Sequence, residues 1–96
     1  MRSHHLHTTT FELLKKFVYQ TLCHHEQLEI GVFPMTEKIL TRRTVPCGVY
    51  FCLHGPRSVK FTAIWEADRN TILFYGATGE RFMKREWTSE TPLLAT

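Results

Sequence analysis

Cysteine and histidine side chains are the first residues in this sequence whose spacing could support chemistry. Cys47, Cys52 and His54 follow the pattern C-x4-C-x-H, and in a strand Cys52 and His54 would point to the same side. Structural zinc sites usually combine two compact ligand pairs, such as C-x2-C with H-x3-H, and neither pair is present. We therefore expect no metal and no cofactor, and we interpret Cys23 and Cys52 as small packing residues.

Nucleophilic catalysis has no recognisable residue set either. Ser58 ends a Gly-Pro-Arg-Ser turn, but the sequence lacks a G-x-S-x-G elbow. Residues 76–80 contain two glycines but lack the lysine and the following helix of a phosphate-binding loop, which indicates a hairpin connection. We predict no catalytic residues. The alternative is a small enzyme or ligand-binding protein with a polar pocket around His54, Arg57 and Arg81.

The elements that must position these residues are mostly strands. Four segments of alternating apolar residues lie between positions 48 and 87, and turn residues separate each from the next. Connections this short join antiparallel neighbours, so the pattern predicts a β-meander. Residues 35–45 fit either a short helix or an edge strand. We favour the edge strand, because Thr41, Thr44 and Val45 have strand propensity and Arg42 with Arg43 suits an exposed edge.

An amphipathic helix is predicted over residues 10–29. Thr9 and Glu12 have the spacing of a capping box, and Gly31 is placed to end the helix. The apolar stripe of this helix comprises Phe11, Leu14, Phe17, Val18, Leu22, His25 and Leu28. The predicted fold class is α+β, with one N-terminal helix packed on a four- to five-stranded antiparallel meander. Residues 9–87 form a single domain, residues 1–8 a flexible arm and residues 88–96 a flexible tail.

Alternation within the strands predicts two apolar sheet faces, of which one helix can cover only one. The face toward the helix carries Val49, Phe51, Leu53, Val59, Phe61, Ala63, Trp65, Ile72, Phe74 and Phe82. The opposite face carries large side chains as well, namely Tyr50, Ile64, Leu73, Tyr75, Met83 and Trp87. Either the sheet is strongly curled, or this second face meets a partner or a ligand. Self-association is the commonest form of such contact, which makes a homodimer an expectation.

Charge gives a weaker indication. The formal net charge is +3, from 12 basic and 9 acidic residues, which is too small to indicate nucleic-acid binding by itself. The candidate anion contacts are Arg57, Lys60, Arg81 and Arg85. A weak RNA- or DNA-binding sheet would add Tyr50 and Tyr75 as stacking platforms. No apolar run approaches the roughly 20 residues of a membrane span, and three cysteines argue against a disulfide framework, so we expect a cytoplasmic protein.

Residues 46–60, together with the stretches 63–65, 69–75 and 79–82, resemble small uncharacterised bacterial proteins. The resemblance covers about the last two-thirds of the chain and implies no activity. The sequence therefore predicts a small non-enzymatic interaction module that binds a protein partner, or itself, through the sheet face opposite the helix.

Overall fold

The computed structural model describes residues 2–87 of the 96-residue chain, so the predicted tail 88–96 lies outside the described residues. Within this range there is one α-helix, α1 (Arg2–Glu26), followed by a sheet of five strands. The strands are β1 (Met35–Arg42), β2 (Val45–His54), β3 (Lys60–Glu66), β4 (Thr71–Tyr75) and β5 (Arg81–Glu86). A short 3-10 turn, η1 (Pro56–Ser58), joins β2 to β3. Each strand pairs antiparallel with the next in chain order, which confirms the predicted α+β meander.

The C-terminal end of α1 is fixed by a Schellman motif rather than by Gly31. Gln27 adopts the left-handed conformation with φ 56°. The Leu28 N–H donates to the Cys23 carbonyl at 2.8 Å, and the Gln27 N–H donates to the His24 carbonyl at 3.2 Å. These two bonds satisfy carbonyls that the helix end would otherwise leave without partners. The helix therefore stops at residue 26, before the predicted end at residue 29.

The N-terminal end of α1 also differs from the prediction. The helix begins at Arg2, so Thr9 lies inside it and the predicted capping box is wrong. Once a helix is nucleated, each further residue adds one backbone hydrogen bond, and three modest helix formers at positions 8–10 do not interrupt it. The flexibility expected of residues 1–8 stays a prediction.

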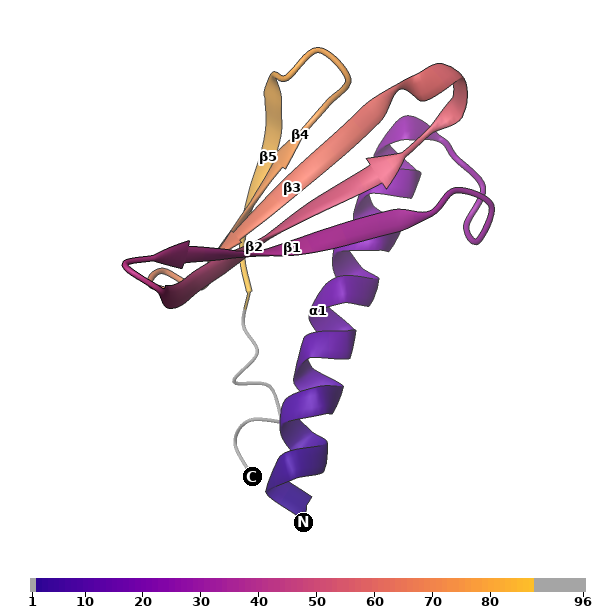
Figure 1. Cartoon of the computed structure of the whole chain (residues 1–96). Helices are drawn as coiled ribbons and strands as arrows, with labels where there is room; N and C mark the ends of the chain where they lie inside the picture. Colours follow the sequence, from indigo (N-terminus) through magenta and orange to yellow (C-terminus); the bar gives the residue numbers. More distant parts are fainter. Residues whose placement is uncertain (1, 88–96) are drawn as a thin grey trace.

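The core lies between α1 and one face of the sheet (Figure 1), and α1 contacts β2 and β3 directly. Its buried residues are Leu14, Val18, Leu22, Cys23, Val49, Phe51, Leu53, Phe61, Ala63, Ile72 and Phe74. The sheet residues in this cluster all belong to the face predicted to pack on the helix. Burial of this many apolar side chains on one side fixes the register of the central strands, since a slip by one residue would expose them.

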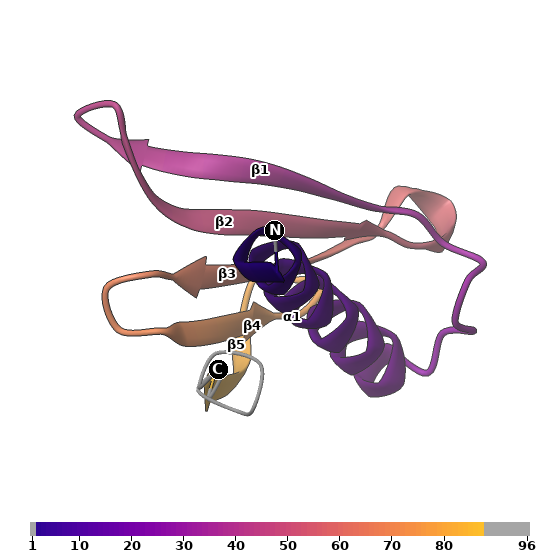
Figure 2. The ribbon, with the colours of Figure 1, turned by 90° about the horizontal axis from the view of Figure 1, so that it is seen from below.

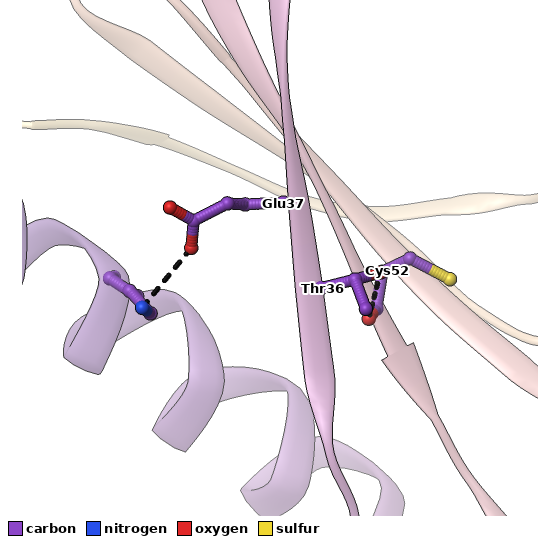
Figure 3. A network of polar contacts seen from close by, with 4 residues as sticks. Thr36, Glu37 and Cys52 are labelled. Atoms are coloured by element: carbon purple, nitrogen blue, oxygen red, sulfur yellow. Dashed lines mark hydrogen bonds and ion pairs between the residues drawn. The ribbon is translucent and has the colours of Figure 1, made fainter.

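Polar contacts hold β1 and the preceding loop against α1. The Tyr19 hydroxyl donates to the Phe33 carbonyl at 2.9 Å and accepts from the Gly31 N–H at 2.8 Å. Lys15 and Glu37 form an ion pair at 3.2 Å, and Figure 3 shows the Glu37 side chain pointing to the helix. β1 is an edge strand of the sheet, as the strand propensity of residues 35–45 predicted.

Candidate interaction face

The sheet face opposite α1 is covered by no other element of residues 2–87, as Figures 1 and 2 show. We call it the open face. Figure 3 shows the Cys52 side chain pointing away from the helix, so residues that alternate in phase with Cys52 lie on this face. Cys52 itself is only 6% exposed.

The centre of the open face is a row of cross-strand partners that runs across all five strands. In order from β1 to β5 the row contains Lys38, Tyr50, Ile64, Leu73 and Lys84. The three apolar members are half-buried, and both lysines are exposed. Direct cross-strand partners have Cβ atoms about 4.5–5.5 Å apart, so Tyr50, Ile64 and Leu73 form one continuous apolar strip with a lysine at each end.

The rows on either side of this strip differ in charge. On the side of the strip that is nearer the first residue of β1, the adjacent row contains Thr36, Cys52, Thr62, Tyr75 and Arg81. One row further out, His54 pairs with Lys60. Toward the opposite end the next row contains Leu40, Gly48, Glu66, Thr71 and Glu86. Within the sheet rows, the open face therefore has a basic end with Lys60 and Arg81 and an acidic end with Glu66 and Glu86. Beyond the acidic row, the turns contribute both signs of charge, with Arg42, Asp68 and Arg69.

A β-bulge in β5 changes which side chains reach this face. Phe74 pairs with Met83, but Tyr75 pairs with Arg81, so Phe82 is the additional residue. The Phe82 ring stacks on the His25 imidazole of α1 at a centroid distance of 3.5 Å and an interplanar angle of 3°. Because Phe82 and Met83 both pack against the core, the alternation of β5 is inverted after the bulge.

Two residues predicted for the open face therefore lie on the helix side. Met83 and Trp87 both pack against the core, and the Trp87 ring lies 5.3 Å from that of Phe17 on α1. Arg85 follows the same inverted alternation, with its guanidinium 5.5 Å from the centre of the Phe17 ring. The prediction of these positions was wrong because it continued a strict period of two through the bulge.

The structure brings four of the six predicted interaction residues together, namely Tyr50, Ile64, Leu73 and Tyr75. Of the candidate anion contacts, Lys60 and Arg81 belong to the basic end of the open face, whereas Arg85 does not. Arg57 is exposed in η1 with φ 57°, outside the sheet.

His54, Arg57 and Arg81, which the sequence suggested as the residues of a polar pocket, do not lie together in the structure. The His54 Nε2 lies 3.0 Å from the Thr36 hydroxyl, at the end of β2. Arg81 pairs with Tyr75 on β4, so β3 and β4 separate its strand from that of His54. None of these three residues lines the hollow between the β1–β2 hairpin and the β3–β4 turn, or the hollow along α1.

Two surface hollows were not found from the sequence, because residues from distant turns form them. One, of about 380 Å³, lies where the β1–β2 hairpin approaches the β3–β4 turn. Its lining is Leu40, Arg42, Cys47, Ile64, Trp65, Glu66, Asp68 and Arg69. Across it Arg42 and Asp68 pair at 3.7 Å, but their side chains are 72% and 75% exposed, so solvent screens this pair strongly. The other, of about 400 Å³, follows α1 beside residues 31–35.

The ionisable groups show little of the perturbation that marks a reactive centre. Burial raises the pKa of the Cys23 thiol, and the nearby Tyr19 hydroxyl opposes this rise by a smaller amount. The hydroxyl of Thr78 lowers the pKa of the exposed Glu80 carboxyl in the β4–β5 turn. Among residues 11–87, whose side chains the structure describes, no three histidine, cysteine or acidic side chains gather closely enough to hold a metal ion. That part of the chain also has no helix of sufficient length and apolarity to cross a membrane.

Comparisons with known proteins add no assignment: no protein-family model matches the chain, and no curated protein or solved structure matches it significantly. Residues 2–87 form a helix-backed antiparallel sheet, one face of which no described element covers.

Proposed function

We propose that this protein is a small non-enzymatic interaction module that binds a protein partner through the open face. The observation that carries the proposal is the strip of Tyr50, Ile64 and Leu73, three adjacent half-buried side chains on a face that no described element covers. Apolar centres with charged surroundings are the usual composition of protein–protein contacts. Lys38 and Lys84 at the ends of the strip supply such a rim.

The composition of the face favours a protein over a nucleic acid. Nucleic-acid sheets stack bases on aromatic rings, but here the aliphatic Ile64 and Leu73 adjoin Tyr50 in the central row. Glu66 and Glu86 occupy one end of the same face and would repel phosphate groups. Aliphatic side chains beside both signs of charge suit a folded protein surface.

Site-specific photo-crosslinking tests the proposal without knowledge of the partner. A benzophenone amino acid replaces Lys84, which is exposed at the rim of the open face. The matched control replaces Gln20, an exposed residue of α1. We expect irradiation of cells that express the chain to give a discrete protein adduct from position 84 and none from position 20. Equal adducts from both positions, or none from position 84, would contradict the proposal.

A further inference from the structure

We propose that the partner is a second copy of this chain, related by a twofold axis that runs across the strands along the row of Tyr50, Ile64 and Leu73. This inference rests on the proposed function, because it identifies the occupant of the same open face. The inference follows from the distribution of charge over that face. The charges of two copies are complementary in only one of the two simple twofold arrangements.

A closed pair of identical chains must present the same patch twice, so every contact between two different residues occurs two times. Sheets that pack face to face lie about 10 Å apart, with their side chains interdigitated. If the axis follows the central row, Ile64 faces its own copy, and so do Tyr50 and Leu73. Lys38 and Lys84 belong to the same row and face their own copies as well, but both are exposed at the sheet edges, where long side chains can diverge into solvent.

Rotation about this axis reverses the strand direction, so the acidic end of one copy lies over the basic end of the other. Arg81 and Glu86 occupy rows on opposite sides of the central row, and both belong to β5. Glu86 of each copy consequently lies over Arg81 of the other copy, and the two contacts are equivalent by symmetry. Opposite charges placed across an interface in this way fix orientation more than affinity.

An axis parallel to the strands gives the unfavourable alternative. The row that contains Glu66 and Glu86 would then lie over the same row of the second copy, and the basic rows would meet each other as well. Like charges that face each other across an interface suppress such an arrangement. The charge pattern of the open face thus selects the axis that crosses the strands.

Charge reversal tests both the partner and the axis. Measured by sedimentation equilibrium from about 1 to 200 μM, a range that brackets ordinary specific affinities, the unmodified chain is expected to dimerise. Arg81→Glu and Glu86→Arg should each weaken the dimer roughly three- to thirtyfold, because each replaces two exposed ion pairs by two like-charge contacts. The double variant should recover the original affinity within about threefold. Lys16→Glu on the exposed surface of α1 is the matched control and should change nothing.

Circular dichroism of each variant first establishes that it is folded. If Glu86→Arg dimerised more tightly than the unmodified chain, the proposed axis would be wrong. Such a gain in affinity belongs to the arrangement in which the acidic rows of the two copies meet. A monomer at about 100 μM would overturn the second copy as partner. In that case, a crosslink from position 84 to a different protein would still support the proposed function. A nuclease-sensitive adduct, or no adduct, would contradict both the proposed function and the second copy as partner.

Discussion

Replacement of Leu73 by glutamate is the most direct perturbation of the open face. Leu73 lies in the central row between Ile64 and Lys84 and is half-buried within one chain. Full burial of a leucine is worth about 1.5–3 kcal/mol, and most of the Leu73 surface is already buried within one chain, so at most about 1 kcal/mol per copy is left for a partner to supply. Two copies lose at most about 2 kcal/mol, which corresponds to a dimer weaker by up to roughly thirtyfold. Two glutamates that face each other near the axis weaken it further.

Sedimentation equilibrium measures this change, and the chain offers a matched control for it. Leu13 is 39% exposed on α1, away from the open face, so Leu13→Glu makes the same substitution without touching the proposed contact. We expect Leu73→Glu to be a folded monomer at concentrations where Leu13→Glu remains dimeric. The reasoning is refuted if the two variants associate equally, or if Leu73→Glu associates as tightly as the unmodified chain.

The remaining predictions concern stability and reactivity. A Cβ on Gly48 would clash with the backbone carbonyl oxygen of Trp65 in β3. Gly48→Ala should therefore lower the free energy of unfolding by about 1–3 kcal/mol, measured as a lower urea midpoint, and an unchanged midpoint would contradict this close approach. Cys23 is buried, which raises the pKa of its thiol, whereas Cys47 is partly accessible to solvent. A thiol reagent at neutral pH should therefore label Cys47 well before Cys23, and equal labelling rates would contradict this prediction. The Thr78 hydroxyl lowers the pKa of Glu80. This hydrogen bond therefore favours the folded state above the pKa that Glu80 has in the unfolded chain, and its effect is lost as the pH falls through the lower pKa of the folded state. Thr78→Val should raise the Glu80 pKa in an NMR titration and leave stability at low pH unchanged.

Local sequence patterns by themselves determined the class of this fold and most of its core. Helical spacing before residue 30 and alternation after residue 48 each follow from how one element repeats its side-chain directions. Turn chemistry is equally local: Asn70, a residue type that tolerates the left-handed region, adopts φ 49° in the β3–β4 turn. The strip of Tyr50, Ile64 and Leu73 could be predicted for the same reason, because the central strands continue without interruption.

Only the tertiary structure decided the composition of the open face beyond that strip. Phe82, the additional residue of the bulge, packs against His25 of α1 and Phe74 of β4, and no pattern within β5 indicates the bulge. One inserted residue transferred Met83 and Trp87 to the helix side, because side-chain direction in a strand reverses with every residue. The same inserted residue brings Arg81 and Glu86 of β5 onto one face, whereas strict alternation over five positions would place them on opposite faces.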